Sequence, residues 1–243
     1  MSRSPLAGRL VLAGLLSGLL WGLSTVKATT RQGVDFTVST LKIPLYVKGL
    51  AFLHRHEQYR VLAQQITRGL ESDHERVLAI FEWTRQHIRL TPSDVPVMDD
   101  HVLHIIIRGH GLDDQIADVF TTLSTYAGTP AFWQTLKVPQ ARAGVVVSFV
   151  KVEGRWRVFD VSRGFIFRDR SGALATPQDI AGHPELIAAV AGDARLGEMP
   201  YTECFGSLAS FNAPRPLRAE LQQPWPRLWD EARRVLGRLG HRL

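Results

Sequence analysis

The feature that most restricts the fold of this chain is a change in the spacing of its apolar residues near position 128. Before that point, apolar side chains recur every three or four residues, which is the pattern of a helix with one buried face. This face comprises Ile116, Val119, Phe120, Leu123 and Ala127. Gly128 and Pro130 then end the pattern, so a core-facing helix is predicted over residues 114–127.

Beyond this helix the period changes to that of β-strands. Residues 145–152 are apolar and rich in valine, Glu153-Gly154 can form a two-residue turn, and residues 155–160 alternate in polarity. This order predicts a β-hairpin, with a third strand over residues 165–167. Helices followed by an antiparallel sheet indicate an α+β fold in which N-terminal helices pack on that sheet.

Two further helical segments precede the central helix. Residues 41–69 have helical spacing that is interrupted by Pro44. Ser72 followed three residues later by Glu75 is the sequence of a capping box, which predicts that a helix begins there. Residues 29–40 are polar and are predicted to form a linker or a short strand.

The N-terminus has the pattern of an export signal. Arg3 and Arg9 precede an uncharged stretch over residues 10–26, and small residues around Ala28 suit a cleavage site. The same stretch is close to the shortest length that spans a bilayer, so an uncleaved anchor is an alternative; a buried helix of the folded domain is another. Residues 1–28 are predicted to be a signal peptide or membrane anchor, which places the protein in the periplasm or on the inner membrane facing the periplasm.

The net charge and the cysteine content restrict which partners and which covalent or metal links are expected. The chain has 243 residues, a formal net charge of +6 and 45% hydrophobic residues, so we expect a folded domain that favours anionic partners such as acidic glycan. The arginines are scattered and the sequence has no nucleic-acid-binding motif, so nucleic acid is not expected as a partner. The single cysteine, Cys204, excludes an intramolecular disulfide and a cysteine-based metal cluster.

Three short motifs in a fixed order point to a known family. They are Gly109-His110-Gly111 leading into residues 112–120, Tyr126-Ala127-Gly128-Thr129-Pro130-Ala131, and Gly154-Arg155-Trp156 followed by Asp160. Together they resemble the transglutaminase-like family, relatives of the papain-type cysteine proteases, over about half of the chain. The resemblance implies a papain/transglutaminase-like form of the α+β fold. We therefore expect an N-terminal helical extension over residues 29–72, a transglutaminase-like domain over 73–212 and a C-terminal basic amphipathic helix over 213–243.

The resemblance also implies which positions would carry catalysis. In the family a cysteine opens the central helix, where the helix dipole lowers the pKa of its thiol. A histidine on the first hairpin strand exchanges the proton, and an aspartate on the second strand orients the histidine. The corresponding positions here are Asp113, Val145 and Asp160. Because two of the three functional groups are missing, we predict a non-catalytic binding or scaffolding protein of the cell envelope, which the resemblance links to surface polysaccharide.

The remaining positions have simpler roles. Asp113 is expected to cap the central helix, and Asp160 to close a turn or pair with an arginine. A ligand is expected in the cleft between the central helix and the hairpin. The candidate ligand-binding residues are His110, Asp113, Asp114 and Trp133, whereas Trp156 is expected in the core. No metal and no cofactor are expected.

Two other functions remain open. A hydrolase could use a cluster of histidines and carboxylates, with or without a bound metal. The cluster comprises Asp99, Asp100, His101, His104, His110, Asp113 and Asp114. Alternatively, Cys204 could retain thiol chemistry. In the C-terminal helix, the apolar face that includes Trp225 and Trp229 is expected to pack on the domain, with binding to anionic lipid as the alternative.

Overall fold

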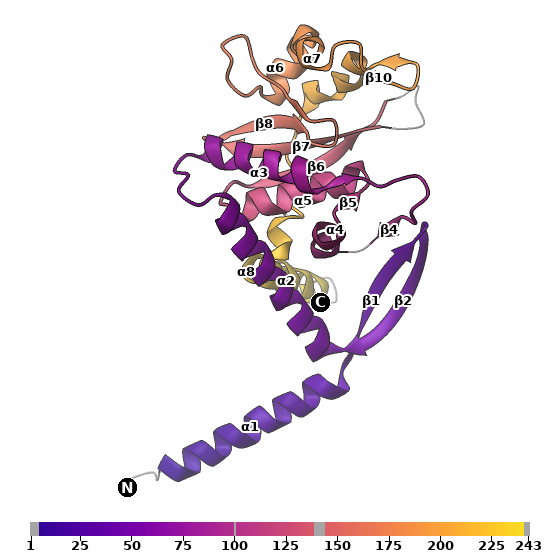
Figure 1. Cartoon of the computed structure of the whole chain (residues 1–243). Helices are drawn as coiled ribbons and strands as arrows, with labels where there is room; N and C mark the ends of the chain where they lie inside the picture. Colours follow the sequence, from indigo (N-terminus) through magenta and orange to yellow (C-terminus); the bar gives the residue numbers. More distant parts are fainter. Residues whose placement is uncertain (1–4, 100, 139–143, 241–243) are drawn as a thin grey trace.

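Figure 1 shows the computed structural model of the chain, which describes residues 5–99, 101–138 and 144–240. The α-helices are α1 (Pro5–Thr25), α2 (Leu45–Ile66), α3 (Asp73–His87), α4 (Val102–Arg108), α5 (Asp113–Tyr126), α6 (Pro177–Gly182), α7 (Pro184–Ala191) and α8 (Pro224–Gly240). The strands are β1 (Lys27–Val34), β2 (Thr37–Pro44), β3 (Arg89–Leu90), β4 (Met98–Asp99), β5 (His110–Gly111), β6 (Ala131–Leu136), β7 (Val145–Val152), β8 (Arg155–Asp160), β9 (Phe165–Ile166), β10 (Arg195–Leu196) and β11 (Met199–Pro200). Two 3-10 helices, η1 (Tyr201–Ser210) and η2 (Glu220–Gln222), complete the described elements.

A four-stranded antiparallel sheet in the order β6-β7-β8-β9 organises the core. In its register, Ser148 of β7 lies between Trp133 of β6 and Phe159 of β8. Because successive side chains of a strand point to opposite faces, β7 supplies two apolar clusters. Val150 packs with residues of α3 and α5 on one face, and Phe149 packs with residues of η1 on the other. The predicted α+β fold with helices on an antiparallel sheet is confirmed.

Helix α5 is enclosed by other elements over most of its length. It contacts α2, α3 and α4 as well as strands β6 and β7, and residues 116–125 are all buried. Phe120 of α5, Phe81 of α3 and Phe159 of β8 pack against one another with ring centroids 5.4 to 5.9 Å apart. The helix observed here and the one predicted over residues 114–127 differ by one residue at each end.

The start of α3 is held as its sequence predicts. The Ser72 hydroxyl oxygen accepts a hydrogen bond from the Glu75 backbone N–H at 3.1 Å, and the Glu75 carboxylate accepts one from the Ser72 backbone N–H at 3.2 Å. Two backbone N–H groups at the helix start thereby gain acceptors, which is the purpose of a capping box.

The segment before α2 differs from the expectation. The predicted linker or short strand is a β-hairpin of two eight-residue strands, in which β1 and β2 pair from Lys27↔Pro44 to Val34↔Thr37. Its two turn residues, Asp35 and Phe36, have φ values of 46° and 63°, as a two-residue hairpin turn of the type I′ class requires. Pro44 ends β2 and α2 begins after it, so Pro44 does not interrupt a helix.

The two terminal helices expose apolar side chains. Helix α1 extends away from the rest of the chain (Figure 1), with Leu10 and Leu15 each 67% exposed, so its reading as a buried helix of the domain is wrong. Among the described residues, no helix combines the length and apolar character needed to cross a bilayer. In α8, Trp225 and Trp229 are 73% and 65% exposed, so the expectation that this face packs on the domain is also wrong.

Candidate functional site

The start of α5 and the end of β8 meet at Arg163. Asp113 is the first residue of α5, and Asp160 is the last residue of β8. The Nη1 atom of Arg163 lies 3.1 Å from Oδ2 of Asp160 and 3.7 Å from Oδ2 of Asp113. Two of the three positions that the family resemblance singles out are therefore joined by one guanidinium group, which the sequence analysis did not identify.

Asp160 is fully buried, and protein donors occupy both of its carboxylate oxygens. Oδ1 accepts hydrogen bonds from the Ser162 hydroxyl and the Arg163 backbone N–H, each at 3.0 Å. Oδ2 accepts from the Arg163 side chain and from the Tyr201 hydroxyl. A buried carboxylate needs such partners to offset the loss of hydration. Asp160 thus closes the turn after β8 and also pairs with an arginine, which are the two roles expected from the sequence.

Asp113 does not cap α5, contrary to the expectation. Leu112 occupies the N-cap position, and its backbone N–H donates to the Gln115 side-chain oxygen at 3.1 Å. Asp113 is the first helical residue, and its carboxylate faces Arg163 instead. Burial raises the pKa of the Asp113 carboxyl, and the Arg163 charge partly opposes that rise. Its negative form still benefits from the positive end of the helix dipole.

Val145 occupies a position in the apolar core. It is the first residue of β7, is fully buried and belongs to the cluster that contains Leu136 and Phe149. An isopropyl group has no proton to exchange. The position that the resemblance assigns to a base is therefore part of the hydrophobic packing between the sheet and η1.

Cys204 lies close to the Asp160 network but is enclosed. It follows Tyr201 by three residues in η1 and is only 2% exposed. Burial raises the pKa of the Cys204 thiol, whereas a cysteine nucleophile needs a lowered pKa and access to its substrate. These properties are those of a buried structural cysteine.

The described histidines and carboxylates between residues 99 and 114 do not converge on one metal-binding point. His101 precedes α4, and His110 lies in β5 with its ring nitrogen Nδ1 3.2 Å from the Thr91 hydroxyl. Within residues 5–99, 101–138 and 144–240, no three His, Cys, Asp or Glu side chains are placed together to hold a metal ion. Asp100, a member of the predicted cluster, lies outside the described residues.

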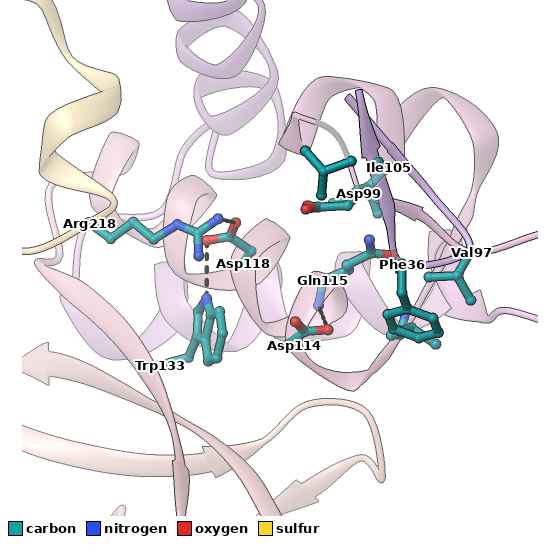
Figure 2. Close-up of a pocket in the computed structure, with 12 residues that line it drawn as sticks. Phe36, Val97, Asp99, Ile105, Asp114, Gln115, Asp118, Trp133 and Arg218 are labelled. Carbon is teal, nitrogen blue, oxygen red and sulfur yellow. Dashed lines mark hydrogen bonds and ion pairs between the residues drawn. The ribbon is translucent and has the colours of Figure 1, made fainter. Parts of the chain in front are cut away.

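A cavity of about 520 Å³ lies beside α5, between this helix and the β1–β2 hairpin (Figure 2). Its wall includes Phe36, Asp99, Asp114, Asp118, Trp133 and Arg218. Three of these residues carry carboxylates and one carries a guanidinium group, so the cavity is acidic although the chain as a whole is basic. Such a mixture of charged groups and an aromatic ring is suited to binding a small polar ligand.

Asp118 lines this cavity and is held there by two neighbouring side chains. Its Oδ1 accepts a hydrogen bond from the Trp133 indole N–H at 3.1 Å, and its Oδ2 lies 2.9 Å from Nη2 of Arg218. The Arg218 guanidinium lies 5.6 Å from the centroid of the Trp133 ring, in a cation–π contact. Burial raises the pKa of the Asp118 carboxyl, and the Arg218 charge and the Trp133 hydrogen bond partly oppose the rise.

The cavity contains only part of the predicted ligand site. Asp114 and Trp133 line it, whereas Asp113 faces Arg163 and His110 contacts Thr91. Between α5 and the β7–β8 hairpin, buried apolar side chains pack against one another, so the cavity described here is not the predicted cleft; the ligand location stays a prediction. Asp118 and Arg218 were not predicted from the sequence. Asp118 follows Asp114 by four residues, a spacing that puts both on one helix face and could have indicated the site.

Part of the chain is similar to proteins of known family and structure. Residues 60–161 match the model of the transglutaminase-like superfamily. One similar solved structure is a proposed cysteine protease from Cytophaga hutchinsonii, with 19% identity, 52% of this chain and 44% of that chain covered, and a TM-score of 0.38. Another is a proposed protease from Parabacteroides distasonis, with 13% identity, 56% of this chain and 36% of that chain covered, and a TM-score of 0.37. The chain thus spans less than half the length of either structure, and no curated protein matches it.

Proposed function

We propose that this chain is a non-catalytic protein that acts by binding, on the basis that residues 60–161 match the transglutaminase-like superfamily. The observation that carries the proposal is the Arg163 guanidinium, which joins Asp113 to Asp160 where the family has a thiolate and an orienting acid. Acyl transfer at such a site needs a nucleophile and a base within hydrogen-bond reach. Here the first position is a carboxylate paired with a cation, and Val145 supplies no base.

The proposed ligand site is the cavity beside α5. The carboxylates of Asp99, Asp114 and Asp118 can accept hydrogen bonds from hydroxyl groups, and Trp133 supplies an aromatic surface. A polyhydroxylated ligand, such as the sugar units of a surface polysaccharide, fits this set of groups. Because carboxylates outnumber the guanidinium in the cavity, we expect neutral sugar units inside it. Acidic groups of the same glycan would face the basic remainder of the surface.

The proposed location is the bacterial cell envelope, with glycan or other envelope proteins as partners. Arg3 and Arg9 precede the apolar stretch of residues 10–26 in the order that an export signal or membrane anchor requires. The exposed leucines of α1 support this proposal, because a cleaved signal or a bilayer would account for their lack of cover.

The test is a titration of the purified full chain with neutral and acidic oligosaccharides, measured by calorimetry. Trp133→Ala and Asp114→Asn should each lower the affinity at least about tenfold, as expected for loss of a stacking surface or of an accepting charge. Asp193→Asn is the matched control, because Asp193 is exposed between α7 and β10. In parallel, incorporation of a fluorescent amine into casein and peptide hydrolysis should show no turnover.

Two results would contradict the proposal in different ways. Turnover that is lost on Asp113→Ala would show that the chain is an enzyme. Glycan binding that is unaffected by Trp133→Ala would place the ligand outside the cavity.

A further inference from the structure

The C-terminal helix α8 has one apolar face that the rest of the chain leaves uncovered. Trp225, Leu228, Trp229 and Leu236 are 60 to 73% exposed. Their spacing of three, four and seven residues puts them on a single side of the helix. On the other side, Arg227 pairs with Glu231 at 2.9 Å and Arg234 pairs with Asp230 at 2.8 Å. The helix is therefore amphipathic, and its apolar side faces outward.

The charge of α8 complements an anionic surface. Its sequence holds four arginines against two acidic residues, so positive charge remains after both ion pairs are counted. Tryptophan and arginine are the residues that favour the boundary between lipid headgroups and acyl chains. If lysine or glutamate replaced the two tryptophans, this side of the helix would be polar and would stay in water.

A hydrogen bond next to the start of α8 places this helix close to α2, which carries a second apolar surface of the chain. The Tyr126 hydroxyl donates to the backbone oxygen of Gln222 at 2.8 Å, two residues before α8, and lies 2.8 Å from Nδ1 of His56 in α2. Helix α8 thus begins beside the middle of α2, away from α6 and α7 (Figure 1). The N-terminal half of α2 and the end of α1 line an apolar groove that includes Leu20, Leu45, Leu50 and Leu53.

We propose that α8 is an interfacial helix that binds the surface of an anionic lipid bilayer, with its Trp/Leu face in the headgroup region. The face is too small for a stable dimer: a 17-residue helix is about 25 Å long and about 10 Å wide, which gives roughly 250 Å², whereas a stable interface buries about 800 Å² per partner. Binding to a bilayer has no comparable minimum area, because the affinity for lipid grows with each buried apolar group and each nearby arginine. This inference uses neither the cavity nor the glycan of the proposed function.

The experiment uses the tryptophans of α8 as reporters in the full chain. Trp21, on α1, is 72% exposed and would also respond to lipid, so all variants carry Trp21→Phe. The other three tryptophans are partly buried in the domain. The protein is titrated with phosphatidylglycerol vesicles that carry brominated acyl chains, which quench tryptophan on contact. Zwitterionic phosphatidylcholine vesicles with the same label measure the contribution of charge.

We expect quenching by the anionic vesicles at lipid concentrations at least about tenfold lower than for the zwitterionic vesicles. Leu228→Gln should raise the lipid required about tenfold. Leu90→Gln should have no effect, since Leu90 is exposed to a similar extent, 55% against 60%, but lies in β3.

Two results would overturn the inference. One is a lipid titration in which anionic vesicles fail to quench the α8 tryptophans or in which Leu90→Gln and Leu228→Gln have equal effects. The other is a lipid-free dimer, detected by sedimentation, that Leu228→Gln dissociates; this would assign the face to a second copy of the chain. Circular dichroism of both variants checks that these exposed substitutions leave the fold intact.

Discussion

Helix α5 presents carboxylates to two arginines, and the two contacts differ in their access to solvent. At the helix start, Asp113 and the buried Asp160 share Arg163, whose side chain is 27% exposed. Farther along the helix, Asp118 pairs with Arg218, whose side chain is 64% exposed. We refer to the first as the closed contact and to the second as the open contact.

The difference explains how the same pair of chemical groups can have two roles. In the closed contact, both oxygens of Asp160 are occupied by donors from Ser162, Arg163 and Tyr201, so the carboxylate offers nothing to a ligand. In the open contact, Asp118 anchors an arginine that has five N–H donors and lies at the wall of a cavity. The closed contact stabilises the fold, and the open contact supports the proposed binding site.

The largest expected effect is the loss of the closed contact. Asp160→Ala should lower the free energy of unfolding by about 3 to 5 kcal/mol, because it leaves Arg163 and Tyr201 without their buried acceptor. Urea denaturation of the variant and of wild type measures the difference. Asp193→Ala, at an exposed position, should change stability by less than about 0.5 kcal/mol. A loss below about 1 kcal/mol for Asp160→Ala would show that the hydrogen bonds of Asp160 contribute little to the stability of the fold.

Thiol labelling tests the enclosure of the same region. Cys204 is buried one turn after Tyr201, and burial raises the pKa of its thiol. Its reaction with a thiol reagent at pH 7 should therefore be at least about a hundredfold slower in the folded chain than in urea, because the reactive species is the thiolate. Equal rates in the two conditions would mean that this region opens freely and that the Cys204 thiol is accessible to reagents.

Loss of the open contact should cost less. Asp118→Ala should lower the free energy of unfolding by about 1 to 2 kcal/mol, since the exposed Arg218 can return to water and mainly the Trp133 hydrogen bond is lost. The same denaturation experiment provides the value, and the emission of Trp133 should change as its indole N–H loses an acceptor. A cost equal to that of Asp160→Ala would remove the distinction between the two contacts.

The smallest effect concerns pH. Burial raises the pKa of the Asp118 carboxyl, so the folded chain holds this proton more strongly than the unfolded chain. The contribution of Asp118 to stability should therefore fall as pH rises from about 4, its unfolded value, through the raised folded pKa. The Asp118→Asn variant lacks this titrating carboxyl, so the melting temperature of the variant relative to that of wild type should increase as pH rises across that range. Asp193→Asn should follow the wild-type profile, and parallel profiles for all three proteins would contradict the prediction.

Local patterns in the sequence predicted most of the fold. The period of α5, the capping box of α3 and the turn between β7 and β8 depend on neighbouring residues, and each was found. The β1–β2 hairpin was missed because its turn uses Asp35 and Phe36 rather than the Asn-Gly or Asp-Gly pairs that signal such turns.

The site was predicted less completely than the fold, for a physical reason. Asp113 and Asp160 could be located from motifs, but Arg218 lies 100 positions after Asp118. Contacts between residues so far apart depend on the folded arrangement and have no local pattern. Arg163 was missed although it is close to Asp160, because a scattered arginine has no distinguishing spacing.

The β1–β2 hairpin connects the cavity to the N-terminal helix. Phe36 and Val38 form part of the cavity wall, and β1 follows α1 directly. The tip of this hairpin joins the domain through a short contact with β4, in which the Asp35 backbone N–H and carboxylate each form a 2.8 Å hydrogen bond with the backbone of Val97. A ligand that contacts both walls of the cavity would therefore strengthen the attachment of the hairpin to the domain. Because such coupling is reciprocal, a force on α1 that loosens the hairpin would weaken the binding of that ligand by the same free energy. Under the proposed function, occupancy of the cavity and mechanical tension on α1 would therefore affect each other.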